Sequence, residues 1–334
     1  MSNILTIKPK TKKGTILIVG ISSFIGSNLA EHFKHDYKVI GTYHDTPVSL
    51  DGIVCVPCDV LVKEEVQSVL YAFRPDITIY CAGISSVIEC AKRESFADAL
   101  NTSGLFNVSE YCQRYKSQIC YISSGYVFGG EDKNYLEMDI PDAITTYGRT
   151  QAAAEFYIQK TSLNYLVFRC CRLYGRGINP SQSTWFELMQ KRLSEGQALP
   201  MDDNVKVGFL DVAYLAMILR ICIEKNVSNR LLQVCSKDIM THYEFSKEYC
   251  RLFDSQVDLI NRSKWMFPIS KNSMRSGSGD KLSFRLDISN IEGYLNIDMP
   301  KIEESLQFTL KKLKGSSLDS SHKTQGGGEG IKFI

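Results

Sequence analysis

Two glycines six residues apart follow the first β-branched run of the chain, and their spacing suits the binding of a dinucleotide. The run Thr15 to Val19 leads into Gly20-Ile21-Ser22-Ser23-Phe24-Ile25-Gly26, where a helical pattern begins. The first glycine permits a tight turn and the second close helix–sheet packing, so a pyrophosphate can rest on the N–H groups of the helix N-terminus. Ser23 replaces the usual middle glycine, and its hydroxyl either binds a phosphate or crowds it. We predict cofactor contacts from Gly20, Ser22, Ser23, Phe24, Ile25 and Gly26.

The ends of the next strands supply further candidates for cofactor binding. The second strand closes in Gly41-Thr42-Tyr43-His44 and offers no carboxylate for a ribose 2′-hydroxyl before Asp45, which slightly favours NADP over NAD. His44 is a candidate partner for a 2′-phosphate, with a bystander on the surface as the alternative. Cys58-Asp59-Val60 and the small residues Cys81-Ala82-Gly83 close the third and fourth strands. Asp59 is alternatively a helix N-cap. The predicted contacts here are His44, Asp59, Val60, Cys81, Ala82 and Gly83.

Short β-branched runs alternate with longer helical patterns as far as Cys170, which is typical of a parallel sheet covered by helices on both faces. The strand candidates are Thr15 to Val19, Tyr37 to Thr42, Ile53 to Cys58, Ile77 to Cys81, Gln118 to Ser123 and Tyr165 to Cys170. Later helices are expected at Thr184 to Leu193, Asp211 to Lys225 and His242 to Phe253. We therefore predict an α/β fold, a doubly wound parallel (Rossmann) sheet with a smaller C-terminal α/β substrate-binding part. The expected divisions are 1–13 (extension), 14–175 (dinucleotide binding), 176–313 (mainly substrate binding) and 314–334 (flexible tail).

Composition excludes several classes of protein. The 334 residues hold 39 Lys plus Arg and 37 Asp plus Glu, a net charge of +2 that favours neither nucleic acid nor a charged membrane surface as partner. The 11 cysteines are odd in number and the chain is long, so we expect reduced thiols. Cys55 and Cys58 lie in a strand-like segment without a second pair, and no metal site is predicted. A polar N-terminus and the lack of a long apolar run predict a cytoplasmic protein.

The fifth strand carries the most specific motif of the chain. It ends in Tyr121-Ile122-Ser123-Ser124-Gly125-Tyr126-Val127-Phe128-Gly129-Gly130, and Thr146-Tyr147-Gly148-Arg149-Thr150-Gln151 follows. With Asn101, the segment Arg169 to Gly177 and Arg285-Leu286-Asp287, this order resembles the extended short-chain dehydrogenase/reductases. Within them it is most similar to the dTDP-4-dehydrorhamnose reductases and the related regulatory β subunit of methionine adenosyltransferase. The resemblance covers about residues 14 to 313.

The resemblance implies roles for three catalytic positions. Ser124 binds the substrate carbonyl, Tyr147 supplies the proton as hydride arrives from the nicotinamide, and a lysine at position 151 binds the cofactor ribose and lowers the tyrosine pKa. The resemblance also adds Asn101 to the cofactor-binding residues. Position 151, however, is Gln, which can bond a ribose hydroxyl but carries no charge. Arg149 lies two residues from Tyr147, so on a helix it points away and does not replace the lysine.

Two classes of function follow from Gln151. The first is an NAD(P)-dependent reductase of a nucleotide-linked 4-keto-deoxysugar, serving polysaccharide biosynthesis. The second is a catalytically impaired NAD(P)-binding regulatory or scaffold protein of the same fold. A nucleotide-sugar epimerase also stays open, whereas Gly125-Tyr126 replaces the acidic pair of the related dehydratases and argues against dehydration.

We expect the second half of the chain to determine substrate specificity. Arg172 and Arg176 are candidates to pair with a nucleotide diphosphate, because a planar guanidinium matches phosphate oxygens, and the alternative is solvated surface arginine. Trp185 is a candidate to stack on a base, with a core position as the alternative. We expect Tyr126 and Phe128 to pack under the sheet edge and Asp211 to cap a helix. The predicted ligand is a nucleotide sugar, and a homodimer stays open.

Overall fold

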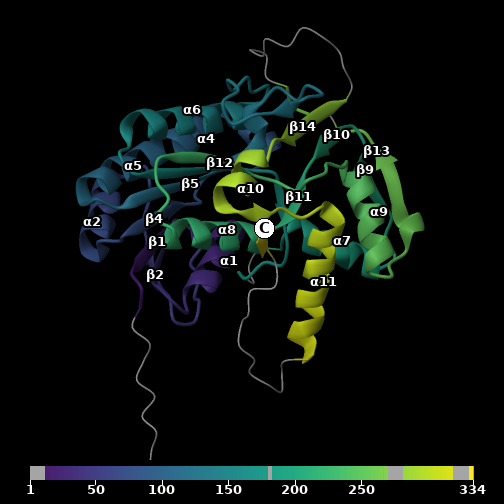
Figure 1. The fold of residues 1–334 in the computed structure, drawn as a ribbon, viewed down its shortest axis with the longest axis horizontal. Coiled ribbons are helices and arrows are strands. Elements are labelled where there is room, and N and C mark those ends of the chain that lie inside the picture. Colours follow the sequence, from purple (N-terminus) through teal and green to yellow (C-terminus); the bar gives the residue numbers. More distant parts are fainter. Residues whose placement is uncertain (1–11, 180–182, 266, 270–280, 319–330, 334) are drawn as a thin grey trace, which may run out of the picture.

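The computed structural model describes residues 12–179, 183–265, 267–269, 281–318 and 331–333. A seven-stranded sheet lies at its centre, in the order β12-β7-β5-β4-β1-β2-β3, with every neighbouring pair parallel (Figure 1). The chain reverses its direction of winding beside β1, and in such sheets ligands bind outside the carboxyl ends of the strands at this point. The strands are β1 (Thr15–Val19), β2 (Lys38–Tyr43), β3 (Val54–Pro57), β4 (Ile77–Tyr80), β5 (Gln118–Ser124), β7 (Tyr165–Cys170) and β12 (Arg230–Val234).

Helices cover both faces of this sheet, which explains why its inner strands are apolar without alternation. Ile16 and Ile18 of β1 join the apolar cluster that contains the helices α1 and α8, whereas Leu17 and Val19 join the cluster of α2, α5 and α6 on the other face. Short helices α3 and α4 lead into a π-helical turn before α5. The bounds are α1 (Phe24–Phe33), α2 (Lys63–Phe73), α3 (Val87–Lys92), α4 (Glu94–Asp98), α5 (Gly104–Tyr115), α6 (Thr146–Thr161), α8 (Val212–Glu224) and α10 (Ser289–Leu295).

A second core lies beyond the sheet, among α7 (Trp185–Ser194), α9 (His242–Leu252) and α11 (Ile302–Leu318). Its centre is aromatic, with Phe209 stacked on Phe245 at a centroid distance of 4.3 Å. Capping boxes at Thr184 and Thr241 begin α7 and α9. Small sheets join its strands, which are β6 (Asn134–Tyr135), β8 (Arg172–Tyr174), β9 (Leu199–Asp202), β10 (Val205–Val207), β11 (Phe209–Asp211), β13 (Ile260–Ser263) and β14 (Leu282–Leu286).

The observed elements begin and end within two residues of those predicted, and Asp211 caps α8 as expected. Two differences concern the later chain. Strand β12 comes from the predicted substrate-binding part yet pairs with β7 in the main sheet, because its apolar Leu232 and Val234 are buried there. In the expected tail, α11 continues to Leu318, and β16 (Lys332–Phe333) pairs with β15 (Ile297–Asp298) beside the buried Ile331.

All eleven cysteines are free thiols, as predicted. Within the ranges that the structure describes, no helix is both long and apolar enough to cross a membrane.

Candidate active site

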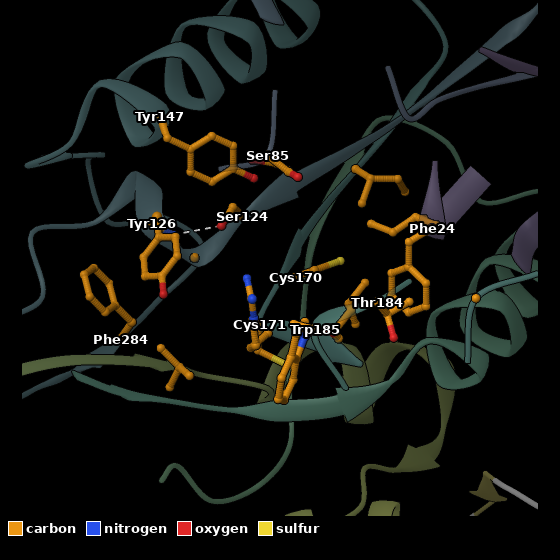
Figure 2. Close-up of a pocket in the computed structure, with 18 of the residues that line it drawn as sticks. Phe24, Ser85, Ser124, Tyr126, Tyr147, Cys170, Cys171, Thr184, Trp185 and Phe284 are labelled. Carbon is orange, nitrogen blue, oxygen red and sulfur yellow. Dashed lines mark hydrogen bonds between the residues drawn. The ribbon is translucent and has the colours of Figure 1, made fainter. Parts of the chain in front are cut away.

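A cavity of about 280 Å³ opens at the carboxyl ends of β5 and β7, beside the N-terminus of α1. Figure 2 shows Tyr147 and Ser124 together on one side of this cavity, with Trp185 across from them. The cavity therefore lies where the sheet topology predicts a ligand site, and it contains both hydroxyl groups that the sequence selects as catalytic.

The glycine turn that precedes α1 has the shape that a dinucleotide phosphate requires. Gly20 has φ +86°, and a Cβ at Gly26 would lie 2.4 Å from the Gly20 carbonyl oxygen, so neither position accepts a side chain. Ser23 is the N-cap of α1, since its Oγ accepts a hydrogen bond from the Gly26 N–H at 3.0 Å. The N–H groups of Phe24 and Ile25 begin the helix without a helical acceptor, and both residues line the cavity. These residues fit the phosphates of a dinucleotide.

The ends of β2 and β3 place His44 between two carboxylates. Its Nδ1 lies 2.8 Å from Asp45 and its Nε2 lies 3.6 Å from Asp59. Asp59 also accepts a hydrogen bond from the Leu61 N–H at 2.9 Å, but the N-cap of α2 is Val62, so Asp59 caps the preceding turn and not the helix. His44 and Asp59 are partly exposed, as a site for the adenosine end of a cofactor requires.

Asn101 holds the loop that follows β4. Its amide accepts from the Ile84 N–H at 2.7 Å and donates to the Ile84 carbonyl at 3.1 Å and to Thr150 Oγ1 at 3.0 Å. The loop approaches so closely that a Cβ at Gly83 would lie 2.5 Å from the Asn101 Oδ1 atom. The side chain of Asn101 is buried and does not line the cavity, so the structure gives it a positioning role beside the loop Cys81-Ala82-Gly83.

Tyr147 lies in the first turn of α6, where the Thr145 side chain caps the helix. Ser124, the last residue of β5, presents its hydroxyl to the same part of the cavity. Burial raises the pKa of Tyr147 far above its usual value, and the neighbouring Ser124 hydroxyl offsets part of that rise. The other groups that act on Tyr147 are two thiols and Tyr126, all of which oppose its ionisation.

Gln151 lies one turn further along α6 and is buried behind the cavity. Its Oε1 accepts a hydrogen bond of 2.6 Å from the Tyr121 hydroxyl. On the next turn, Glu155 receives hydrogen bonds from Arg169, whose Nη2 lies 2.8 Å away, and from the Ser123 hydroxyl. The positions 147, 151 and 155 thus form one helix face against β5, with a neutral hydrogen bond where the resemblance predicts a cation.

Arg149 does not supply the missing charge. Its Nη2 lies 3.9 Å from Glu94 and donates to the Thr146 hydroxyl at 3.3 Å, away from Tyr147, as the sequence spacing predicts.

The two arginines proposed for substrate binding lie in different places in the structure, one inside the cavity and one outside it. Arg172, on β8, lines the cavity with its guanidinium carbon 5.3 Å above the Trp185 ring. Trp185 also lines the cavity and donates from its indole N–H to the Leu173 carbonyl at 3.3 Å. Arg176 is exposed and lies outside the cavity, in a neighbouring hollow with Asp211 and Lys312, because the chain turns away after Gly175 (φ +140°).

Phe128 packs as expected, whereas Tyr126 both packs against the second core and lines the cavity. Phe128 is fully buried and stacks on Tyr135. Tyr126, however, lines the cavity with its ring 6.3 Å from that of Tyr147, because the short helical turn after β5 swings the side chain toward α6.

Several residues of the site were missed from the sequence. Ser85, Asn179 and Phe284 line the cavity, and Asn179 donates to the Ser22 carbonyl at 3.0 Å, which ties the second half to the glycine turn. His242 lies behind Trp185, and neither of its buried ring nitrogens has a hydrogen-bond partner. Burial, and then the charge of Arg172, lowers the pKa of His242 to about 3. No local pattern singles these residues out, since they come from two separate loops, from β14 and from the start of α9.

A family model described as RmlD substrate binding domain matches residues 14–314. The chain belongs to this family. It is 24% identical over 292 residues to the probable low-salt glycan biosynthesis reductase Agl14 of Haloferax volcanii, which covers 86% of this chain and 95% of that protein. It is 22% identical over 282 residues to the methionine adenosyltransferase 2 subunit beta of Danio rerio, covering 83% and 84%.

Solved structures of the same fold support this assignment. The dTDP-4-dehydrorhamnose reductase of Bacillus anthracis, in complex with NADP, is 20% identical with a TM-score of 0.75, covering 91% of this chain and 99% of that one. The UDP-glucose 4-epimerase of Thermotoga maritima, with UDP-glucose, is 18% identical with a TM-score of 0.72 and the same coverage. The predicted fold and the resemblance to dTDP-4-dehydrorhamnose reductases are therefore confirmed.

Proposed function

We propose that this family member is an NAD(P)-dependent reductase of a nucleotide-linked 4-keto-deoxysugar. The observation that carries the proposal is the placement of the Ser124 and Tyr147 hydroxyls in one cavity beside the glycine turn. The named functions of the relatives favour the same class, since Agl14 is a probable glycan biosynthesis reductase and the Bacillus anthracis neighbour is a reductase in complex with NADP.

Each part of the site has a role in this reaction. The dinucleotide, with NADP preferred and NAD as the alternative, supplies the hydride when bound. The turn Gly20 to Gly26 holds its phosphates, and His44 and Asp59 lie toward its adenosine end. Ser124 donates a hydrogen bond to the substrate carbonyl oxygen, and Tyr147 donates the proton that this oxygen takes up. Arg172 and Trp185 lie across the cavity, where they contact the substrate.

A second candidate is a dinucleotide-binding regulatory protein that has lost catalysis. The neutral Tyr121–Gln151 hydrogen bond favours it, because no cation among the described residues lowers the high pKa of Tyr147. One relative of this chain is named as the β subunit of methionine adenosyltransferase. Its name describes a subunit of another enzyme and not a reductase, which is consistent with a regulatory role. An epimerase is the third candidate, because the fold is shared with a UDP-glucose 4-epimerase.

Turnover and binding separate these candidates. Purified protein is mixed with NADPH and a panel of nucleotide 4-ketosugars, and oxidation is followed by absorbance beside the Tyr147→Phe and Ser124→Ala variants. Tyr71→Phe, an exposed tyrosine on α2, is the matched control. The reductase proposal requires oxidation that falls at least about a hundredfold in both site variants and is unchanged in the control.

Other results select the alternatives. Dinucleotide binding by calorimetry with no turnover above the Tyr147→Phe level selects the regulatory protein. Interconversion of nucleotide sugars without net oxidation of NADPH selects the epimerase. A failure to bind either dinucleotide refutes all three.

A further inference from the structure

One charge stands out in the cavity. Among its described lining residues, Arg172 is the only Asp, Glu, Lys, Arg or His, and the remainder are apolar, hydroxyl, thiol or amide groups. Arg172 is partly buried, and a cation in such surroundings is costly unless an anion accompanies it, because the cavity wall does not replace the hydration it loses.

The residues that the structure describes do not provide that anion at Arg172. No carboxylate within the described ranges forms an ion pair with Arg172, and its buried Nε has no hydrogen-bond partner. On one side the guanidinium faces the Trp185 ring, which attracts it without neutralising it. His242 lies behind that ring, and its low pKa keeps it uncharged at neutral pH. The charge of Arg172 is thus available to a ligand.

Arg172 shares one cavity with Ser124 and Tyr147. Tyr126 lines the same cavity, with its ring edge-on against Tyr147 at a centroid distance of 6.3 Å. Burial raises the pKa of Tyr126, while the charge of Arg172 lowers it and the charge of the buried Asp202 raises it further. Asp202 does not line the cavity, and its carboxylate accepts hydrogen bonds from the N–H groups of Val205 and Trp265. An anion bound to Arg172 would therefore lie in the cavity that holds the substrate carbonyl.

Among the described lining residues Arg172 is the one cation, which favours a singly charged group as its partner. A nucleotide diphosphate carries two phosphoryl charges, but the second candidate arginine, Arg176, lies outside the cavity. One planar guanidinium matches one carboxylate in charge and in bidentate geometry. We infer that the substrate is an acidic member of the proposed keto-deoxysugar class, whose ring carries a carboxylate that Arg172 binds inside the reaction cavity. This inference rests on the proposed function for the reaction but concerns only recognition.

Recognition can be measured with sugars that do not react. UDP-glucuronate and UDP-glucose differ only in a carboxylate against a hydroxymethyl group, and the corresponding dTDP sugars form a second pair if the base is thymine. Calorimetry in the presence of NADP⁺ gives Kd for each sugar and for UDP and dTDP alone. We expect the wild-type protein to bind the uronate about 10- to 100-fold more tightly than the glucose sugar of the same nucleotide.

Variants of Arg172 test whether this side chain causes the preference for the uronate. Arg172→Gln should abolish it by weakening the uronate alone, and Arg172→Lys should retain part of it, since an ammonium keeps the charge but loses the planar fork. Arg114→Gln removes a matched exposed arginine on α5 and should leave every Kd unchanged. Circular dichroism and thermal melting confirm that each variant is folded, and the wild-type preference tests the inference without any variant.

Three results would overturn the inference. The inference is wrong if the wild-type protein binds the uronate and the glucose sugar of one nucleotide with equal affinity. It is also wrong if the wild-type protein binds neither the UDP-linked nor the dTDP-linked uronate. If Arg172→Gln instead weakens the uronate, the glucose sugar and the free nucleotide diphosphate alike, the guanidinium holds the diphosphate. A uronate preference without any NADPH turnover would refute the proposed reductase and leave the carboxylate site standing.

Discussion

Replacing Gln151 by lysine tests whether one missing charge limits catalysis. The side chains at 147 and 151 lie one turn apart on the same face of α6, at a spacing of about 5 to 6 Å. At ~5 Å and an effective dielectric constant near 20, an ammonium stabilises a tyrosinate by roughly 3 kcal/mol, which corresponds to about two pKa units. Glu155 is already bound to Arg169 and Ser123, so it does not neutralise the new ammonium.

The expected result is a stronger acid at Tyr147. In Gln151→Lys we expect kcat/KM for ketosugar reduction to rise by ~10- to 100-fold, since the donor pKa moves toward the working pH. The limb of the pH–rate profile that reports ionisation of Tyr147 lies at high pH, because burial raises its pKa, and it should move down by about two pH units. The assay is NADPH oxidation from pH 7 to 12, with Gln151→Lys/Tyr147→Phe as the background.

Gln151→Met is the matched neutral control. It removes the hydrogen bond from Tyr121 without adding a charge, so it should change neither the rate nor the pH profile in the direction that lysine does. The reasoning is refuted if folded Gln151→Lys leaves rate and profile unchanged, or if methionine raises the rate as much as lysine.

Three further predictions follow from contacts in the fold. Gly26→Ala should weaken dinucleotide binding at least about tenfold by calorimetry, because its Cβ would lie 2.4 Å from the Gly20 carbonyl oxygen in the phosphate turn. Glu155→Gln should lower the free energy of unfolding in urea by about 3 to 5 kcal/mol, because it leaves Arg169 buried without its carboxylate. His242 has a folded-state pKa of about 3 against 6.5, so the unfolded chain binds the extra proton between these values and stability falls as pH falls through that window. His242→Phe should remove this loss, which amounts to about 2 kcal/mol between pH 8 and pH 5 in urea unfolding.

Each of these variants has a control elsewhere in the chain. Gly293→Ala adds a methyl group in open space on α10, Glu64→Gln removes an exposed carboxylate of α2, and His35→Gln removes an exposed histidine. Unchanged dinucleotide affinity in Gly26→Ala, or a loss of stability in Glu155→Gln no larger than in its control, contradicts the corresponding contact. If His242→Phe and the wild type lose equal stability between pH 8 and pH 5, the histidine is not the titrating group.

Local patterns in the sequence were sufficient for the first six strands of the sheet and for the glycine turn, and the family resemblance supplied the hydroxyl pair. A buried strand such as β7 needs consecutive apolar residues, and its bounds, Tyr165 to Cys170, are those predicted. The turn before α1 needs glycine at Gly20, where φ is positive, and at Gly26, where the backbone approaches closely. Because these requirements involve only a few neighbouring residues, they can be predicted from residue type and spacing.

The environment of the same residues depended on the tertiary structure. The sequence showed that Gln151 is not lysine, but only the packing of α6 on β5 brings Tyr121, thirty positions away, to its amide. Arg172 and Arg176 are equivalent candidates by spacing, yet β8 directs the first into the cavity and the turn after Gly175 carries the second outside it. Strand pairing and helix packing decide which distant groups meet, and hydrogen bonding, neutralisation and burial of a side chain depend on those neighbours. The sequence alone therefore determined which chemical groups this protein has, and the tertiary structure decided which of them act on one another.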